Sequence, residues 1–351
     1  MCANTTHLLQ EHVQTALNDR VALKIVAGNS KHFYGRATDG QLLTIVDHRG
    51  ILNYEPSELV VTARAGTPLT ELSQVLAEKG QWLGFEPPHF GETATLGGTI
   101  ACGLSGPSRP YLGAVRDFVL GVKCLTGKGE VLKFGGQVMK NVAGYDVSRL
   151  LVGSLGTLAV LLDISCKVLP KPAEEITLVS PATLAEGLQQ MIQLSQHYLP
   201  VTASCADGEN LYLRLSGIAL QTARQKIPGE IYPDGAKFWE AVREHRLAFF
   251  TGDLPLWRLS VPATTPLLKL TGTTLIEWGG ALRWLRSELP AVDIRRAVVE
   301  IGGHATLFRG GDRHSEIFQP LPPALGHLHR RLKEKFDPHG ILNPGRMMAE
   351  W

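Results

Sequence analysis

Glycine is concentrated between residues 84 and 156 of this chain, in loops that separate apolar segments. The run KNVAGYDVSRLLVGSLGTLAVL, residues 140–161, places three glycines and the pair Tyr145-Asp146 between two apolar stretches. A chain needs glycine where its backbone turns tightly, or lies so close to a neighbour that a Cβ would not fit. An ordinary core needs few such positions, so we expect the main chain here to lie directly against a ligand.

Three glycine-bearing loops in the first half of the chain follow strands or precede helices: residues 27–31, 95–103 and 153–156. Unpaired backbone N–H groups in such loops form sites for anions. Each loop by itself is typical of a plain turn, but the three in this order indicate one large anionic ligand. The fingerprints G-x-G-x-x-G after the first strand and G-x-x-x-x-G-K-[ST] are absent, which argues against the usual dinucleotide fold and against nucleoside triphosphate hydrolysis.

Apolar periodicity predicts helices and strands in alternation through the first half. A Thr cap opens a helix over residues 5–20, and a second helix over 67–80 is capped by Thr67, continues through Pro68 and ends at Gly80. Segments rich in β-branched and apolar residues predict strands, two of them paired as a hairpin around residues 127–129. The expected strands are 22–26, 42–46, 59–65, 118–125, 130–134 and the stretch LAVLLDISCKVLPKP.

Pro170 and Pro172 mark a boundary, beyond which the pattern of expected helices and strands changes. A helix is expected within ATLAEGLQQMIQLSQHYLP and another within the segment 226–250, with strands in NLYLRLSG, LWRLSVP and AVVEIGGHATLF. The tail holds a basic helix that ends at Asp337-Pro338. The pattern beyond the boundary predicts an α+β domain that is distinct from the first half of the chain.

Charge and cysteine content limit the class of protein. The net charge of +2 gives no broad basic surface for nucleic acid or an anionic membrane. Five cysteines with no C-x-x-C spacing predict reduced thiols and no iron–sulfur or zinc site. The N-terminus lacks a signal-peptide core, and no apolar run reaches the roughly 18 residues that span a bilayer. We therefore expect a cytoplasmic protein with no transmembrane anchor, which could meet the inner membrane only through partners.

The run from Pro87 to Pro172 resembles the FAD-binding domain of the vanillyl-alcohol oxidase and para-cresol methylhydroxylase (PCMH) family. The segments that carry the resemblance are TATLGGTIACG, GAVRDFVLGVKCLTGKGEVLKFGG, KNVAGYDVSRLLVGSLGTLAVL and KVLPKP. Nearly end to end, the chain is similar to the FAD-binding subunits of bacterial glycolate oxidases. GNSKHFYGR, EPPHFGE, IEWGGALRWLR and GGHATLFRGGD carry this closer likeness, and FDPHGILNPGRM resembles the C-terminal flavin-contacting segment of the wider family. The resemblance implies a two-subdomain PCMH-type FAD domain over residues 1–171 and an α+β cap domain with an antiparallel sheet over 172–325. It also implies a C-terminal segment, 326–351, that returns to the FAD domain.

The resemblance implies where FAD binds. Residues Ala27 to Lys31 would offer N–H groups to the pyrophosphate, the loop Thr95 to Gly103 would follow the pyrophosphate and the flavin edge, and Gly153 to Val160 would surround the adenine. Tyr145 and Asp146 would brace that last loop, and Asn343 would approach the flavin ring from the tail. The residues expected to bind the cofactor are Ala27, Gly28, Asn29, Ser30, Lys31, Thr95, Gly97, Gly98, Thr99, Cys102, Gly103, Tyr145, Gly153, Gly156, Val160 and Asn343.

The chain departs from the family pattern at three places. Leu155 and Ala159 replace the Glu and the last Gly of the usual Gly-Ser-Glu-Gly-Thr-Leu-Gly, so a contact at the adenine end is expected to differ. Relatives with covalent flavin carry His in the first loop, where this chain has Ser30, with His32 two positions on. We therefore expect FAD that is bound without a covalent link.

His304, in EIGGHATLF, is the candidate base or hydroxyl-orienting group for a hydroxy acid. Arg283 and Arg286, predicted one turn apart on a helix, are candidates for a carboxylate because a guanidinium makes two parallel bonds to it. Arg109 and Arg346 are rivals nearer the flavin segments. A structural His and surface arginines are the plainer interpretations.

Other motifs are given structural interpretations. His304, Asp312 and His314 could hold a metal, but a solvated loop is favoured and no metal site is predicted, since the longer His-rich motif of related 2-hydroxy-acid dehydrogenases is not reproduced. Cys102 is expected to be a small packing residue beside the flavin, and Trp278 and Trp284 are expected to be core or interface residues.

The resemblance implies an FAD-dependent oxidoreductase that oxidises glycolate, or a similar short 2-hydroxy acid such as D-lactate, to the 2-oxo acid. Its implied partners are a larger FAD-linked subunit and an iron–sulfur subunit, which would take the electrons because this chain has no cluster ligands. One alternative is a subunit that holds FAD only as a relay or structural element beside a catalytic sister subunit. Another is the flavin subunit of a molybdenum hydroxylase, against which GGHATLF and the tail argue.

Overall fold

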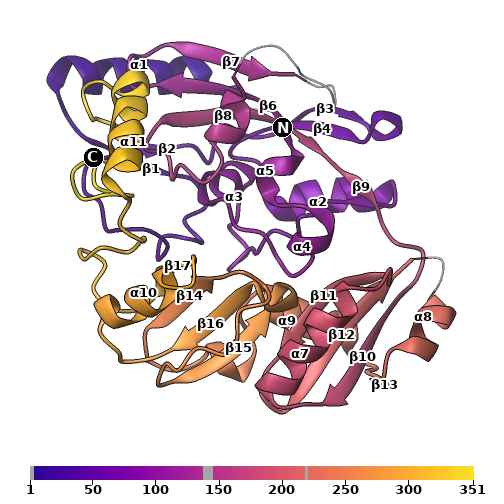
Figure 1. Cartoon of the computed structure of the whole chain (residues 1–351). Helices are drawn as coiled ribbons and strands as arrows, with labels where there is room; N and C mark the ends of the chain where they lie inside the picture. Colours follow the sequence, from indigo (N-terminus) through magenta and orange to yellow (C-terminus); the bar gives the residue numbers. More distant parts are fainter. Residues whose placement is uncertain (1–3, 137–144, 218–219) are drawn as a thin grey trace.

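The computed structural model describes residues 4–136, 145–217 and 220–351, so the beginning of the KNVAGYDV run, residues 140–144, lies outside the described part (Figure 1). In Figure 1 the N-terminal half lies above an eight-stranded sheet that the chain forms after residue 174. The chain then returns to the N-terminal half through helix α11 (Pro323–Phe336) and the tail. Together with the antiparallel pairings, this arrangement confirms the expected α+β fold.

The N-terminal half is built on a five-stranded antiparallel sheet with the order β3-β4-β8-β6-β7. Helix α2 contributes Leu69, Leu72 and Leu76 to the hydrophobic core of this half. Thr67 does not cap this helix, because its hydroxyl accepts a hydrogen bond from the N–H of Gly50 instead. The elements are α1 (Thr6–Asp19), β1 (Leu23–Val26), β2 (Gln41–Thr44), β3 (Ile51–Glu55), β4 (Val60–Arg64), α2 (Leu69–Glu78), β5 (Gln81–Trp82), α3 (Leu96–Cys102), α4 (Arg109–Leu112), α5 (Val115–Phe118), β6 (Val119–Thr126), β7 (Val131–Gly135), α6 (Val147–Leu150), β8 (Ala159–Lys167) and β9 (Leu169–Pro170).

The eight-stranded sheet has the order β13-β10-β12-β11-β15-β16-β14-β17, and its paired strands are antiparallel. One face packs on α7 and α10 through residues such as Met191 and Ile294. The other face, with Trp284 and Phe308, packs against Tyr34 and other residues of the N-terminal half. The elements are β10 (Glu175–Pro181), α7 (Leu184–Ser195), β11 (Val201–Ala206), β12 (Asn210–Ser216), α8 (Leu220–Lys226), β13 (Glu230–Ile231), α9 (Gly235–Arg243), β14 (Leu256–Ser260), β15 (Thr273–Glu277), β16 (Leu282–Arg286), α10 (Ala291–Val299) and β17 (His304–Arg309).

Two predictions in this region were wrong. The segment GGALRWLR forms strand β16 and not a helix, because alternate side chains must reach opposite faces of the sheet. Trp284 faces the N-terminal half, whereas Leu285 packs on the side of α10. In AVVEIGGHATLF only the second part is a strand, since residues up to Val299 complete α10.

Buried charges join the two sheets. Arg214 of β12 makes two hydrogen bonds to the carboxylate of Glu86, at 2.7 and 2.9 Å, and both residues are buried. The carboxylate of Glu244, just after α9, accepts hydrogen bonds from the backbone N–H groups of His89 and Phe90. These contacts hold the loop 86–90 of the N-terminal half against the eight-stranded sheet.

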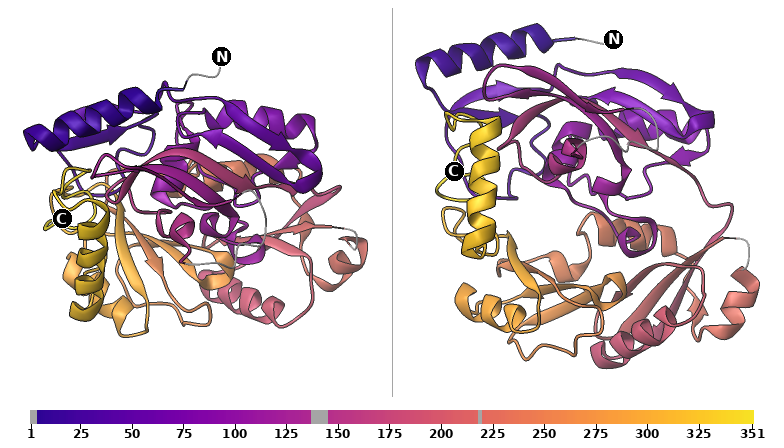
Figure 2. Two further views of the ribbon diagram at one scale, coloured as in Figure 1. Left: turned by 90° about the horizontal axis from the view of Figure 1, so that it is seen from above. Right: turned by 45° about the horizontal axis from the view of Figure 1, so that its top comes forward.

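A buried ion pair fixes the C-terminal segment to the N-terminal half, beside which α11 lies in both views of Figure 2. The ammonium of Lys333 donates hydrogen bonds to Asp337, at 2.6 Å, and to the carbonyls of Thr157 and Leu342. The Asp337 carboxylate also accepts from the N–H groups of Ile341 and Leu342. Lys333 therefore joins α11 to the turn at Thr157 by a hydrogen bond.

Replacing Lys333 with Met is expected to destabilise the protein strongly, because the Asp337 charge would remain buried without its partner. Breaking a buried pair in this way costs about 3–5 kcal/mol. The measurement is the thermal midpoint of the purified chain, with Lys335→Met as the control, since Lys335 lies on the same helix but is exposed. Equal midpoints for the two variants would contradict the role given to Lys333.

Candidate functional site

A cavity of about 870 Å³ lies at the carboxyl end of β1, between the N-terminal half, the segment after β17 and the tail. Its volume lies in the range of roughly 300–1,000 Å³ that is typical of cofactor sites. The walls come from residues 24–33 with Gly35 and residues 37–40, from α3, and from Leu155, Gly310, Arg313, Asn343 and Arg346, among others. A smaller apolar pocket of about 80 Å³ adjoins it and shares Ile25, Ala27, Gly98, Ala101, Leu155 and Asn343 with it.

The first predicted loop lies where the sequence places it. All five residues from Ala27 to Lys31 line the large cavity. Gly28 is required for packing, since a Cβ there would overlap the carbonyl oxygen of Thr93. Asn29 adopts a left-handed conformation with φ of 56°, which Asn tolerates better than most residues. The loop thus directs its main chain toward the cavity.

Lys31 brings a positive charge to this loop. Its side chain is only 6 % exposed, and its ammonium donates hydrogen bonds to the Ser30 hydroxyl, at 3.3 Å, and to the carbonyl of His89, at 3.1 Å. Burial lowers the pKa of Lys31, and the nearby Cys102 and Glu244 act in the opposite direction. An anionic ligand in the cavity would compensate the buried ammonium.

Helix α3 forms a flat part of the cavity wall. Thr95 caps the helix by accepting a hydrogen bond from the N–H of Gly98 at 3.2 Å. A Cβ on Gly98 would meet only the Thr95 hydroxyl, at 3.2 Å, so this glycine leaves room on the cavity side. Gly97 instead packs on the fold, since a Cβ there would lie 2.6 Å from the Cβ of Ala65. Thr95, Gly98 and Cys102 line the large cavity, and Gly97 lines the apolar pocket.

Four predicted cofactor residues line neither space. Gly103 and Gly153 pack on each other, because a Cβ on Gly103 would lie 2.9 Å from the Cα of Gly153. Thr99 is fully buried within the fold. Tyr145 is 98 % exposed, which contradicts the expectation that its ring braces the adenine loop. Asp146 does stabilise local structure, since it caps α6 at the N–H of Arg149.

The turn at Leu155 and Gly156 is held by the tail. The Asn343 side chain accepts a hydrogen bond from the N–H of Ile25 and donates one to the carbonyl of Leu155, both at 2.7 Å. Gly156 and Val160 line the apolar pocket, and a Cβ on Gly156 would lie 2.8 Å from the Asn343 amide nitrogen. Asn343 therefore shapes the cavity by joining three segments with one amide group.

Cations outnumber acids around the cavity. Arg313 and Arg346 line it together with Lys31, Lys24 and a single carboxylate, Asp39. Burial, followed by the charge of Arg346, lowers the pKa of Arg313 to about 10. This electrostatic environment suits a ligand with several negative charges, such as a pyrophosphate.

The predicted catalytic residues lie in two different places: Arg283 within the eight-stranded sheet, and Arg109 and His304 at the interface between the two sheets. Arg283 is 2 % exposed and donates to the carbonyls of Gly280, Thr265 and Pro266, so it is a structural residue of the sheet. The guanidinium of Arg109 lies 4.6 Å from the centre of the Trp278 ring, at the interface between the two sheets.

His304 begins β17 on the same interface. Desolvation, then the charges of Arg258 and Arg109, lower the pKa of His304. The structure thus brings His304 and Arg109 to one region, together with Arg258, which the sequence analysis missed. The alternation in LWRLS was the signal that could have placed Arg258 on the inner face.

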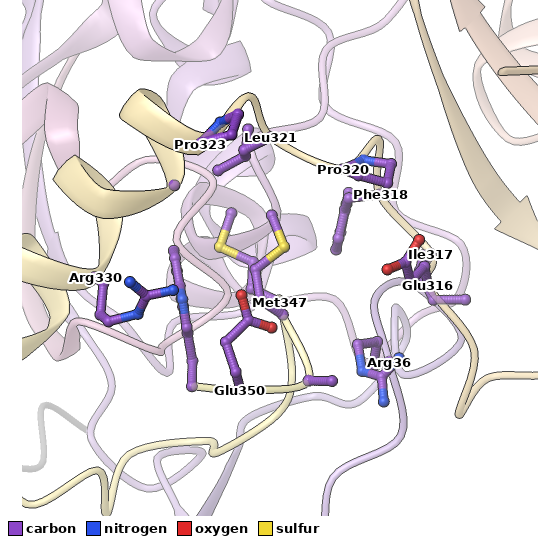
Figure 3. Close-up of a pocket in the computed structure, with 14 residues that line it drawn as sticks. Arg36, Glu316, Ile317, Phe318, Pro320, Leu321, Pro323, Arg330, Met347 and Glu350 are labelled. Atoms are coloured by element: carbon purple, nitrogen blue, oxygen red, sulfur yellow. The ribbon is translucent and has the colours of Figure 1, made fainter. Parts of the chain in front are cut away.

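A separate pocket of about 210 Å³ lies beside the tail, and Figure 3 shows its lining. Its walls come from the segment 316–323, the start of α11 and residues 347–351, with Phe318 and Met347 facing the space between them. The pocket shares no lining residue with the large cavity and has none of the glycine loops. It offers no comparable setting for a large anionic ligand.

Within residues 4–136, 145–217 and 220–351, no group of three or more His, Cys, Asp or Glu side chains is placed to hold a metal ion. His314 lines the large cavity, whereas His304 lies at the other end of β17. In the same described ranges, no helix has the length and apolar character needed to cross a bilayer.

Several known proteins are similar to this chain. Residues 1–135 match the family described as FAD binding domain. The chain is 47 % identical over 344 residues to glycolate oxidase subunit GlcE of Escherichia coli (strain K12), which covers 97 % of both proteins. It is 31 % identical over 162 residues to a D-lactate dehydrogenase of Anaerostipes hadrus, over 46 % of this chain and 34 % of that one. A solved structure of an alkyldihydroxyacetonephosphate synthase matches with a TM-score of 0.65 at 17 % identity, over 96 % of this chain and 75 % of the other.

Replacing Gly98 with Leu is expected to abolish cofactor binding while the fold is retained, because the new side chain would extend into the cavity. The matched control is Gly97→Leu, which would clash with Ala65 and should lower the thermal midpoint instead. The measurements are the flavin absorbance per protein and the thermal midpoint without cofactor. Normal flavin content in Gly98→Leu would contradict the placement of the cofactor against α3.

Proposed function

The chain belongs to the family of glycolate oxidase subunits to which GlcE belongs, and from this premise we propose that it oxidises glycolate, or a similarly short 2-hydroxy acid such as D-lactate, within a multi-subunit complex. FAD is its cofactor, and its class is that of the FAD-dependent hydroxy-acid oxidoreductases. The larger cavity would hold the cofactor, and the eight-stranded sheet would cover the reacting end.

The observation that carries this proposal is the cavity of about 870 Å³ with its glycine wall and its excess of cations. Gly98 leaves the space that a Cβ would fill. Lys31, Arg313 and Arg346 bring positive charge to a lining with one carboxylate, Asp39, although both arginines already donate to main-chain carbonyls. The residues therefore fit a flavin dinucleotide, whose pyrophosphate is anionic and whose ring is flat and apolar. When bound, FAD supplies the two-electron acceptor for the hydroxy acid.

We propose that FAD is bound without a covalent link, because Ser30 stands where relatives with covalent flavin carry His. Ser30 and Lys31 carry no group that forms the stable bond of a covalent flavin. His32 and Cys102 also line the cavity. Cys102 is a thiol whose pKa is raised by burial, which makes it a poor nucleophile.

Trichloroacetic acid precipitation of the holoprotein is therefore expected to release all the yellow chromophore into the supernatant. Absorbance of the supernatant and of the washed pellet at the flavin maximum is the measurement. The variants His32→Ala and Cys102→Ala serve as controls and should behave as the unmodified protein does. Chromophore that stays with the pellet, and leaves it only in one of these variants, would contradict the proposal and identify the linked residue.

We further propose that the electrons leave through an iron–sulfur subunit and that a larger FAD-linked subunit completes the complex. GlcD of Bacillus subtilis, itself named as a glycolate oxidase subunit, is 28 % identical to half of this chain, as expected of two flavoprotein subunits with a common domain. The alternative is a subunit that holds FAD only as a relay. The polar groups at the interface between the two sheets, His304, Arg258 and Arg109, favour a complete site, because a relay needs no such groups there.

Anaerobic addition of glycolate to the isolated chain is expected to bleach the flavin absorbance. D-Lactate is the second substrate, and acetate, which has no hydroxyl group, is the control that should leave the spectrum unchanged. An unchanged spectrum with glycolate and D-lactate, in a preparation that dithionite bleaches fully, would assign the chain to the relay role.

A further inference from the structure

Arg258 lies on the sheet face that is turned toward the N-terminal half, in β14, which is next to the edge strand β17. In β14 it pairs with Trp284 of β16 on one side and with Thr306 of β17 on the other. Its guanidinium lies 5.1 Å from the centre of the Trp278 ring. Among the residues that the structure describes, none accepts a hydrogen bond from this guanidinium or forms an ion pair with it.

Arg258 is half-buried, whereas the fully buried arginines of the same sheet are satisfied by protein groups. Arg214 pairs with Glu86, Arg283 donates to three carbonyls, and Arg286 donates to the carbonyls of Gly252 and Leu254. A charge withdrawn from water without a partner is costly unless a ligand compensates it. The side chains of Arg258, Arg109 and Arg309 all lack a hydrogen-bond or ion-pair partner among the described residues, and of these three only Arg258 lines the small cavity beside Trp278.

A small cavity of about 30 Å³ opens at Arg258. Its lining includes His245, Glu277, Trp278, Trp284 and Phe308. The Nδ1 atom of His245 is buried and has no hydrogen-bond partner in the described part of the chain. The His245 ring is held rigidly, because it stacks on Phe250 with ring centres 3.9 Å apart. Arg243 also lines the pocket but is paired with Glu244, so the pocket combines the Arg258 guanidinium with an unused imidazole nitrogen.

The charges of Glu277 and Arg258 act on each other's pKa, but the Glu277 carboxylate is bonded elsewhere. It accepts a hydrogen bond from the Trp284 indole at 2.7 Å, and no ion pair joins it to Arg258 among the described residues. Burial raises the pKa of Glu277 to about 7, so this carboxyl carries less negative charge at neutral pH than an exposed Glu. A negative group of a ligand would supply what Glu277 does not.

The pocket adjoins the large cavity. Phe90 and Phe308 line the pocket, and both pack against Phe33, which lines the large cavity, with ring centres 5.4 and 5.5 Å apart. The buried Tyr34 connects the two in another way, since the charges of both Arg258 and Cys102 act on the pKa of its hydroxyl. Arg258 therefore lies where a substrate could be held beside a cofactor in the large cavity.

We propose that Arg258 binds the carboxylate of the substrate in this pocket, and that the pocket admits only 2-hydroxy acids of two or three carbons. This inference rests on the proposed function and identifies its substrate site. A guanidinium suits a carboxylate because it makes two parallel hydrogen bonds to it. The aromatic walls from Trp278, Trp284 and Phe308 limit the length of the acid, and the free nitrogen of His245 can bond to its hydroxyl group.

Oxalate, which resembles glycolate but cannot be oxidised in the same way, is the probe of the carboxylate site. Its dissociation constant is measured by calorimetry on the FAD-loaded chain and on the variants Arg258→Met and Arg258→Lys. We expect Arg258→Met to weaken oxalate binding about 30-fold or more and Arg258→Lys to weaken it less. Arg296→Met is the matched control, because Arg296 is an exposed arginine of the same half of the chain.

The flavin content and thermal midpoint of each variant show whether it is folded. If Arg258→Met does not fold, Arg258→Lys still tests the inference. Unchanged oxalate binding in both Arg258 variants, or no oxalate binding by the unmodified protein, would overturn the inference. Competition by D-mandelate, a 2-hydroxy acid with a phenyl group, as strong as that by glycolate would overturn the size limit. Failure of the proposed function would give a different result: the unmodified protein would neither hold FAD nor be bleached by glycolate.

Discussion

The amide group of Asn343 is the contact on which the cofactor cavity depends. It joins β1, the turn at Leu155 and the tail, and its partners Ile25 and Leu155 lie 318 and 188 residues from it along the chain. A cavity wall made of loops has few contacts of its own, so it needs a polar group that satisfies several main-chain atoms at once. Asn343 meets this need because its side chain both donates and accepts, and because Asn tolerates its φ of 42°.

The ion pair of Lys333 and Asp337 stabilises the chain next to Asn343. They bind the turn at Thr157 on one side and the N–H groups of Ile341 and Leu342 on the other, only one residue before Asn343. The tail is therefore part of the cofactor domain in physical terms, although the whole eight-stranded sheet separates the two in sequence. Glycines then complete the wall wherever a side chain would fill the space, as at Gly98.

The sequence was informative where a local rule decides the outcome. Apolar periodicity located most strands and helices of the N-terminal half, and the glycine loops located the cavity. The prediction of a helix at GGALRWLR was wrong. Two arginines three residues apart can lie on one face of a helix or on opposite faces of a strand, and the sequence does not distinguish these cases. It failed also for Gly103, Gly153 and Thr99, whose positions serve packing between α3 and the neighbouring turn. Such a role depends on contacts far apart in sequence, which no local pattern records.

Arginine illustrates why function required the structure. In the sequence Arg109, Arg283, Arg286 and Arg346 are the candidates for binding an anion, and nothing there distinguishes Arg258. In the fold Arg283 and Arg346 are occupied by main-chain carbonyls, whereas Arg258 and Arg109 face the Trp278 ring without such partners among the described residues. The distinction lies in hydrogen-bond satisfaction, because a guanidinium that already donates to carbonyls stabilises the fold and has little left to offer a ligand.

The loop 86–90 connects the two halves of the site physically. Its His89 carbonyl accepts a hydrogen bond from Lys31 at the large cavity, and the N–H of the same residue donates to Glu244 beside the eight-stranded sheet. Glu86 at its start is held by Arg214, and Phe90 at its end lines the pocket of Arg258. A reaction between a substrate and a cofactor held by different halves of a chain needs a fixed separation between them. This short loop sets that separation, since each of its ends is tied to the sheet and its middle is tied to the cofactor loop.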